Sequence, residues 1–398
     1  MHAQHIVQGF IHSHLVRMHA GRRKVLAQAV GAIVAGHFLS LTRIARALSG
    51  AVRLKAALKR VDRLIGHGRI EREACMVGAL LLEQLSRLSG TLVILVDWSP
   101  VNPGGSFVEL RAAVSYPGMG RALTLYQRVH AQGQLGSGKL ERALLDQLHR
   151  WLGGRGQVIV VTDAGFRRSW FAHVEQLGWE WVGRVRRGVM LAAPAAAGAG
   201  PGPWQELGSW FTRASGRAKR FAHCWLSKRG CWPCQVVLVR RRVVGGKRYR
   251  CPGYGSTPKA AREARQSAQE PWLLVHSAAL SAYLPEQIVA FYAARMQIEE
   301  CFRDNKSLRF GMGQELGRSR SALRLHALLL IATLASYLMW HIGQLAEAEG
   351  LHRHFKATTR LKRELSLISL ARLICSLPPL HLSQFAIHAL YERLNIRL

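Results

Sequence analysis

The chain has 398 residues, of which 49% are hydrophobic and 20% are charged, with 56 Lys and Arg, 23 Asp and Glu and a formal net charge of +33. The ordinary apolar content, with 11 Trp and 12 Phe that need packing partners, excludes a mainly disordered chain. The positive charge exceeds what an enzyme for a small acidic substrate needs. It indicates a polyanionic partner, and nucleic acid is the obvious candidate.

The sequence gives little indication of a secreted or membrane protein. The seven Cys are too dispersed for a disulfide framework, and the first five residues, Met-His-Ala-Gln-His, lack the pattern of a signal peptide. The uncharged runs 25–42 and 325–346 are long enough to span a membrane. Because both are amphipathic, with polar residues on one side, we predict buried core helices rather than spans. We therefore expect a cytoplasmic, bacterial protein without a membrane partner.

Residues 1–90 have a helical pattern and hold 14 Lys and Arg against 4 Asp and Glu. Within them, helix 39–48, the dipeptide Ser49-Gly50 and basic helix 54–64 are compatible with a DNA-binding helix-turn-helix. The alternative is a helical hairpin with a solvated face, and the sequence does not choose between the two. The cations of the second helix are Lys55, Lys59, Arg60 and Arg63.

From residue 91 the pattern changes to apolar runs typical of buried strands. The run 91–96 ends at Asp97, and the run 157–162 ends at Asp163. The remaining predicted elements of this part are strands 106–115, 122–130 and 180–185 and helices 139–152 and 167–177. A parallel crossover between the first and fourth strands would place the two aspartates side by side, at the sheet edge where α/β folds carry their sites.

The later part of the chain begins with a Pro-, Ala- and Gly-rich linker over 191–203. Residues 204–270 have short β-like stretches, with 15 Lys and Arg against 3 Glu, and are predicted to form a basic, strand-rich insertion. Helices are predicted over 288–309, over 319–347 and in the last fifty residues. We predict that residues 1–90 form a helical DNA-binding domain and that residues 91–190 form the first part of the catalytic core. A β-rich basic insertion over 191–275 separates it from the second part of the core, over 276–345. Residues 346–398 form a C-terminal helical region with possible dimer contacts.

Acidic residues are scarce, so their placement is informative. Asp97, Asp163 and the pair Glu299 and Glu300 could bring three carboxylates to one point, a set that suits two divalent ions in phosphoryl transfer. The alternative is that the aspartates only cap turns. On one helix over 288–309, Glu299 shares a face with positions 292, 295 and 306, whereas Glu300 lies about 100° away. We therefore expect Glu299 to be the third ligand.

The segment from Tyr292 has the form Tyr-x2-Arg-x3-Glu-x6-Lys and ends at Lys306. At this point the sequence resembles the DDE transposases of the fourth insertion-sequence family, which is named for that signature. Val96-Asp97-Trp-Ser and Thr162-Asp163-Ala-Gly-Phe are similar to the family's first and second aspartate motifs, and 179–186 is similar to the strand that follows. The long, β-rich gap between Asp163 and Glu299 is also a trait of the family.

The resemblance implies an α/β fold with a ribonuclease-H-like core, in which Asp97, Asp163 and Glu299 bind two Mg²⁺ ions, with Mn²⁺ as a substitute. It also implies excision of a DNA element at its terminal inverted repeats and joining of the 3′-hydroxyls to target DNA by a dimer. Tyr292, Arg295 and Lys306 match residues with which the family holds the element's end.

Two further signals have competing interpretations. Trp272 begins a predicted strand and is either a core aromatic or a platform for a base turned out of the duplex. Cys224, Cys231, Cys234 and Cys251 could form a zinc site or a redox pair, but ordinary cysteines fit the spacing better.

We therefore expect a cut-and-paste DNA transposase. The alternatives are a structure-specific nuclease on the same core, which would cleave but never join, and an inactive DNA-binding regulator derived from a transposase.

Overall fold

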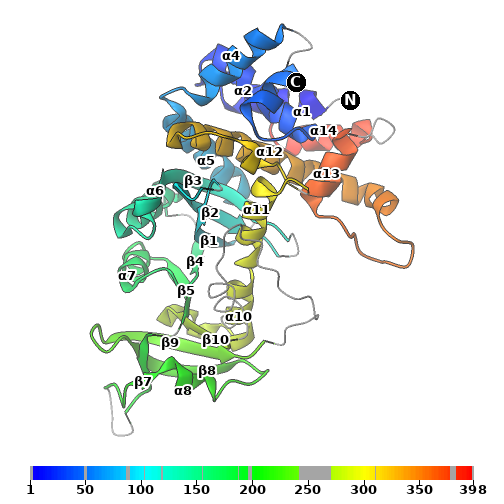
Figure 1. The fold of residues 1–398 in the computed structure, drawn as a ribbon. Helices are drawn as coiled ribbons and strands as arrows, with labels where there is room; N and C mark the ends of the chain where they lie inside the picture. The colour runs from blue at the N-terminus through cyan, green and yellow to red at the C-terminus, as the bar shows by residue number, and fades with distance from the viewer. Residues whose placement is uncertain are drawn as a thin grey trace.

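The structure is a computed structural model that describes residues 3–48, 52–86, 90–102, 104–117, 120–154, 156–186, 188–195, 200–241, 270–309, 311–376 and 382–396. A large sheet occupies the centre of the molecule, and helices from both ends of the chain gather at its upper end (Figure 1). Both termini lie at this helical end, and the strands of the insertion lie at the opposite end.

The first part of the chain is helical, as predicted. The run 25–42 does not form one helix, because α2 ends at Val34 and the chain turns through Gly36, whose φ of 93° favours glycine. Residues 49–51, the predicted turn between α3 and α4, lie outside the described residues. The five helices are α1 (Ala3–His14), α2 (Ala20–Val34), α3 (Leu41–Leu48), α4 (Leu54–Ile65) and α5 (Ile70–Ser86).

The next seven β-strands and α-helices appear in the predicted order β-β-β-α-β-α-β. The apolar runs of the strands are long enough for strands but too short and too β-branched for helices. They are β1 (Thr91–Pro100), β2 (Phe107–Ser115), β3 (Leu123–Ala131), α6 (Gly138–Leu152), β4 (Gln157–Thr162), α7 (Arg168–Gln176) and β5 (Glu180–Val185).

The insertion extends the same sheet. The strand order is β3-β2-β1-β4-β5-β10-β9-β8-β6-β7, in which β1, β4 and β5 are mutually parallel and the other pairs are antiparallel. The added elements are β6 (Met190–Ala192), β7 (Gln205–Glu206), α8 (Leu207–Phe211), β8 (Lys219–Leu226), β9 (Trp232–Val239) and β10 (Trp272–His276). Because β10 pairs directly with β5, the insertion is continuous with the part of the sheet that contains β1, β4 and β5.

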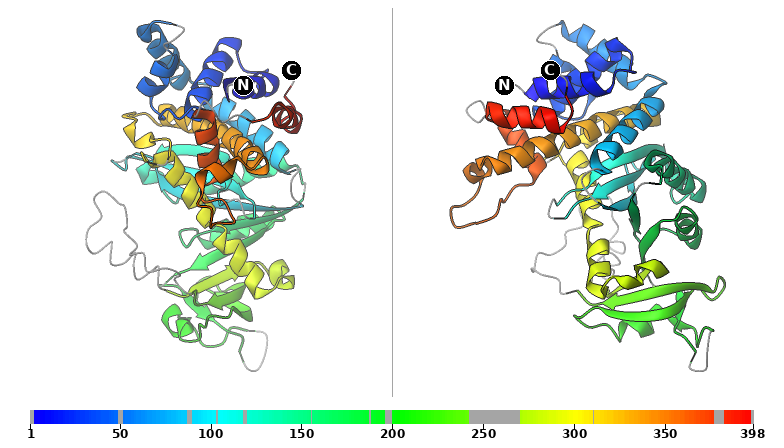
Figure 2. Two further views of the ribbon diagram at one scale, coloured as in Figure 1. Left: turned by 90° about the vertical axis from the view of Figure 1, so that its right-hand side faces the viewer. Right: turned by 180° about the vertical axis from the view of Figure 1, so that it is seen from behind.

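The two faces of the sheet have different covers (Figures 1 and 2). Helices α6 and α7 lie on one face, and α10 (Pro285–Ala293) and α11 (Met296–Lys306) lie on the other. Side chains alternate along the strands, so Leu95, Val161 and Val182 share a buried cluster with Ile288 and Ile298 of the second pair of helices. Alternation thus decides which strand residues face α10 and α11.

Helix α12 (Ala322–Ala348) is long and apolar enough to cross a membrane by length and composition, but 78% of its most apolar window is buried within the fold. It packs against α2, α5 and β3, between the N-terminal helices and the sheet. It serves here as a core helix. The remaining helical elements are η1 (Gln132–Gln134), η2 (Ala278–Ala282), η3 (Gln314–Leu316), η4 (Leu351–Phe355), α13 (Leu367–Ser376) and α14 (Gln384–Arg393).

Candidate active site

Asp97 lies on β1, and Asp163 directly follows the adjacent parallel strand β4. The last parallel pair of β1 and β4 is Val96 with Thr162, so the next residue in each segment is one of the two aspartates. One detail of the expectation is wrong, because β1 does not end at Asp97. It continues to Pro100, paired with β2 alone. Asp97 therefore marks the end of the parallel pairing rather than the end of the strand.

Each aspartate also makes a local hydrogen bond to the backbone. Asp163 Oδ1 accepts the Gly165 N–H at 2.8 Å, and Asp97 Oδ1 accepts the Trp98 N–H at 2.8 Å. The turn-stabilising role considered from the sequence is thus present at Asp163. Each of these bonds uses the Oδ1 atom, and in Asp97 the other oxygen, Oδ2, binds Arg295.

The predicted single helix over 288–309 is two helices. Helix α10 ends at Ala293 and α11 begins at Met296. At the junction, the Arg295 N–H donates to the Tyr292 carbonyl and the Ile298 N–H donates to the Arg295 carbonyl, each at 3.1 Å. These bonds span three residues rather than four and form a tight turn of 3₁₀ type. The turn lies at Arg295, whose side chain contacts Asp97.

Arg295 joins the helix to the strand. Its Nη1 donates to Asp97 Oδ2 at 3.1 Å, and its Nη2 donates to Glu299 Oε1. Arg295 is 9% exposed, whereas the Glu299 side chain is 38% exposed. The guanidinium therefore lies between two of the three predicted ligands, and the site opens to solvent on the Glu299 side.

Glu300 points elsewhere. Its carboxylate pairs with Arg303 at 2.6 Å and with Arg121 at 3.4 Å, and Arg121 also binds Asp304 at 2.6 Å. The expected separation of Glu299 from Glu300 therefore holds in the geometry, even though the helix is interrupted.

Asp163 and Glu299 both act electrostatically on Asp97. Burial raises the pKa of Asp97 to about 7, Arg295 opposes the shift, and the negative charges of Asp163 and Glu299 add to it. Mutual repulsion of this kind is relieved by a cation.

The donor set fits a divalent metal ion in chemistry, because all three groups supply the hard oxygen ligands that Mg²⁺ and Mn²⁺ prefer. Among the residues that the structure describes, however, no three His, Cys, Asp or Glu side chains stand in a ready coordination arrangement. Arg295 supplies the positive charge instead. Its guanidinium binds one oxygen of Asp97 and one oxygen of Glu299.

The other predicted DNA contacts of this region also face the sheet. Lys306 Nζ donates to Ser99 Oγ on β1 at 2.7 Å. Tyr292 is 3% exposed and meets Trp272 edge to face, with ring centroids 4.8 Å apart. The Arg241 guanidinium lies 4.7 Å from the centroid of the Trp272 ring. Trp272 is thus part of an aromatic and cationic group next to the site, as either interpretation from the sequence allows.

Arg184 is a candidate site residue that the sequence motifs did not indicate. The β4–β5 register pairs Thr162 with Gly183, which places Arg184 beside Asp163 on the neighbouring strand. Arg184 also interacts with the Tyr292 side chain. In the sequence, Arg184 could have been noticed as a single arginine within an otherwise apolar strand.

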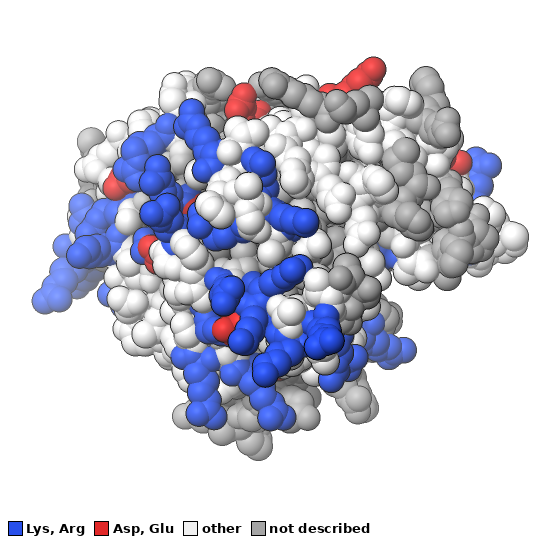
Figure 3. Space-filling model, turned by 90° about the horizontal axis from the view of Figure 1, so that it is seen from above, with Lys and Arg blue, Asp and Glu red and all other residues white. Residues whose placement is uncertain are grey.

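The four predicted cations of residues 54–64 lie together on α4. Lys55, Lys59, Arg60 and Arg63 are all exposed, whereas Ala57, Val61 and Leu64 of the same helix are buried. Seen from the helical end, Lys and Arg outnumber Asp and Glu on this surface (Figure 3). This arrangement is compatible with both a DNA-binding face and a solvated face.

The cysteines of the insertion do not assemble a metal site within the described residues. Cys224 and Cys234 are buried cross-strand partners, Cys231 is exposed, and all three are free. Cys251 lies outside the described residues.

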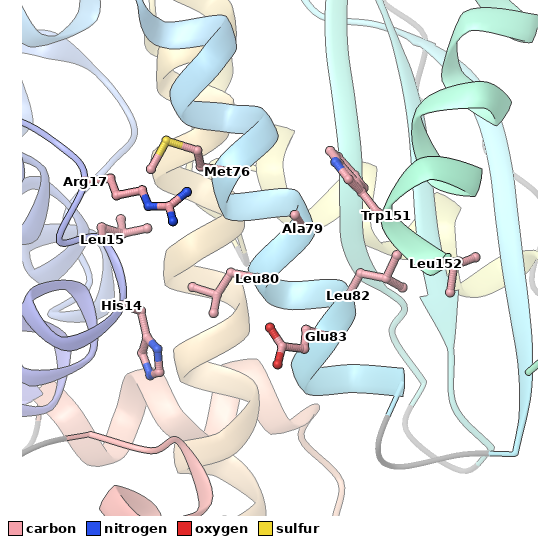
Figure 4. A pocket seen from close by; sticks show the side chains of 10 residues that line it. All are labelled: His14, Leu15, Arg17, Met76, Ala79, Leu80, Leu82, Glu83, Trp151 and Leu152. Carbon is pink, nitrogen blue, oxygen red and sulfur yellow. The ribbon is translucent and has the colours of Figure 1, made fainter. Parts of the chain in front are cut away.

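A separate cavity of about 390 Å³ lies between α1, α5 and α6 (Figure 4). Its lining combines apolar side chains with His14, Arg17 and Glu83. It contains none of the predicted site residues.

The chain is similar to known transposases. A family model described as "Transposase DDE domain" matches residues 89–337, which include Asp97, Asp163 and Glu299. No curated protein matches. Among solved structures, the chain is similar to a piggyBac transposase in a synaptic complex with hairpin DNA, with 11% identity and a TM-score of 0.37 over 95% of this chain and 78% of that chain. This likeness is too distant to support an inference about individual residues.

The raised pKa of Asp97 predicts a pH-dependent effect of Asp97→Asn on stability. In the unfolded chain this carboxyl has its ordinary pKa of 3.8, and in the fold it titrates near 7. Between these values the folded state binds more protons, so the wild type loses stability as the pH rises. The asparagine variant does not undergo this loss.

We therefore expect the melting temperature of Asp97→Asn, relative to wild type, to be higher at pH 8 than at pH 5, in buffer with a metal chelator. The exposed Glu315→Gln variant is the control. A relative melting temperature of Asp97→Asn that does not change between the two pH values would show that this carboxyl is not buried as described.

Proposed function

Because this chain belongs to the transposase DDE domain family, we propose that it is a cut-and-paste DNA transposase that cleaves the ends of an element and joins the 3′-hydroxyls to target DNA. The observation that supports the proposal is the position of Asp97 and Asp163 just beyond the last parallel pair of β1 and β4, with Glu299 joined to Asp97 through Arg295. The strand order β3-β2-β1-β4-β5 supports a ribonuclease-H-like core.

The residues of the site have distinct tasks in this proposal. Asp97, Asp163 and Glu299 would hold two Mg²⁺ ions, which when bound activate a water or hydroxyl and stabilise the leaving oxygen. Before metal and DNA bind, Arg295 neutralises two of these carboxylates. When Arg295 releases them, its guanidinium is available for a DNA phosphate, together with Lys306. Tyr292 was also expected to contact DNA, but it is buried, and its ring centroid lies 5.8 Å from the Arg295 guanidinium, so its role would be to support Arg295.

The proposal also covers the DNA substrate, the oligomeric state and the cellular compartment. The substrate is double-stranded DNA carrying terminal inverted repeats, and the net charge of +33 supports a polyanionic partner. We propose that a homodimer cuts two ends together, and that the protein acts in the bacterial cytoplasm on nucleoid DNA.

The test uses the purified chain and a labelled duplex that carries the repeat flanking its gene. We expect Mg²⁺-dependent cleavage at the 3′ end, followed by joining to a second duplex. Asp163→Ala should bind the duplex but not cleave it, because loss of a ligand displaces a metal ion while phosphate contacts elsewhere remain. Cleavage without joining would favour a nuclease, and binding without cleavage by the wild type would favour a regulator.

A matched pair of variants tests the third ligand. Glu299→Ala should lose metal-dependent cleavage by at least about a hundredfold, the scale seen when one group that stabilises the transition state is removed. Glu300→Ala should keep most of the activity, because its carboxylate binds Arg121 and Arg303 away from Asp97. The reverse pattern would contradict the assignment.

The DNA-binding role of α4 is tested by changing Lys55, Lys59, Arg60 and Arg63 together to Gln. Substitution is preferable to deletion, because α2, α4 and α5 pack on α12 and their removal would expose its apolar surface. The slope of log affinity against log salt should become shallower by about 0.9 for each DNA phosphate that the variant no longer neutralises. The exposed pair Lys139→Gln and Arg142→Gln on α6 is the control. An equal change in the control would indicate that α4 is only a solvated face.

A further inference from the structure

Strand β2 carries a buried ion pair close to the site. Glu109 is 0% exposed and Arg111 is 1% exposed. Arg111 Nε and Nη2 both donate to Glu109 Oε2, at 3.1 and 2.7 Å. Within the described residues, Glu109 Oε1 is buried without a hydrogen-bond partner. Because desolvation makes such a pair no more stabilising than well-packed apolar residues, stability alone does not account for it.

The register of β1 and β2 places this pair beside the candidate ligands. Glu109 lies opposite Ser99, and Arg111 lies opposite Asp97. Phe302 of α11 covers the pair, with its ring centroid 4.6 Å from the Arg111 guanidinium. Side chains on directly opposed strand positions are within contact distance. An unrestrained Arg111 could therefore pair with Asp97, and its double hydrogen bond to Glu109 prevents this.

Lys306 approaches the same cluster from the end of α11. Its ammonium donates to Ser99 Oγ and lies 5.6 Å from the Phe302 ring centroid. Burial lowers the pKa of Lys306, and the charge of Glu109 is the largest opposing influence. The other charged groups that act on it are Arg111, which also lowers the pKa, and Glu315 and Asp97, which raise it.

We propose that Glu109 is a positioning residue: together with Ser99 it holds the Lys306 ammonium beside the active site, and by binding Arg111 it keeps that guanidinium away from Asp97. The inference rests on the proposed function, in which Lys306 contacts a DNA phosphate. Glu109 itself is buried and touches neither DNA nor metal.

The test measures the reactivity of Lys306 in the full chain without DNA or metal. The protein is treated with limiting acetic anhydride at neutral pH, and acetylation of Lys306 is quantified by mass spectrometry relative to the exposed Lys139. Glu109→Gln removes the charge but keeps the shape. The matched control is Glu141→Gln, since Glu141 is also buried and accepts a hydrogen bond from Trp98 on the other face of β1.

We expect Lys306 labelling to rise in Glu109→Gln and not in Glu141→Gln, by about tenfold for each unit by which its pKa falls. Unchanged labelling in a folded Glu109→Gln protein would overturn the proposal. If Glu109→Gln does not fold, Ser99→Ala takes its place: increased labelling supports the proposal, and unchanged labelling overturns it.

Single-turnover cleavage provides the second readout. Glu109→Gln should cleave the repeat at least about tenfold more slowly than wild type, whereas Glu141→Gln should retain the wild-type rate. If the wild type itself does not cleave, the proposed function fails, while the labelling result still decides whether Glu109 positions Lys306. Increased labelling with an unchanged cleavage rate would overturn the link between this position and catalysis.

Discussion

The parallel pairing of β1 with β4 is the contact on which the site depends. It brings two residues that are 66 positions apart in the chain to adjacent strands, each one step beyond the last parallel pair. Neither aspartate could meet the other through local structure. The site therefore exists only when the sheet has formed, and the insertion joins this same sheet through the pairing of β10 with β5.

The charge balance of the site is maintained by the protein itself. Three carboxylates near one another repel, and burial of Asp97 adds to the cost of its ionisation. Arg295 offsets this by binding Asp97 and Glu299 at once. A cation supplied by the chain itself thus allows the carboxylates of Asp97 and Glu299 to lie close together.

Helices α10 and α11 and the strands beneath them contribute to the site together, because side chains of the helices bind side chains of β1. The turn between α10 and α11 places Arg295 over Asp97, and the end of α11 places Lys306 over Ser99. Beneath both, β2 contributes Glu109 and Arg111, which are buried and bound to each other. The strands thus carry charged side chains under the helices that hold Arg295 and Lys306.

Local patterns in the sequence were enough to predict the order of the core elements and the place of the two aspartates, because strand length and apolar runs are local properties. They also predicted the helical first part, including exposed cations on α4. The choice of Glu299, which depends on the spacing of the Tyr-Arg-Glu-Lys segment, stays a prediction. Local patterns could not show that the helix breaks at Arg295, because residues 288–309 have an unbroken helical pattern, and the bond of Arg295 to Asp97 joins residues distant in the chain. Nor could they show that the insertion extends the core sheet, or that Glu109 lies opposite Ser99, since strand pairing and register depend on residues distant in the chain and are decided only when the sheet assembles.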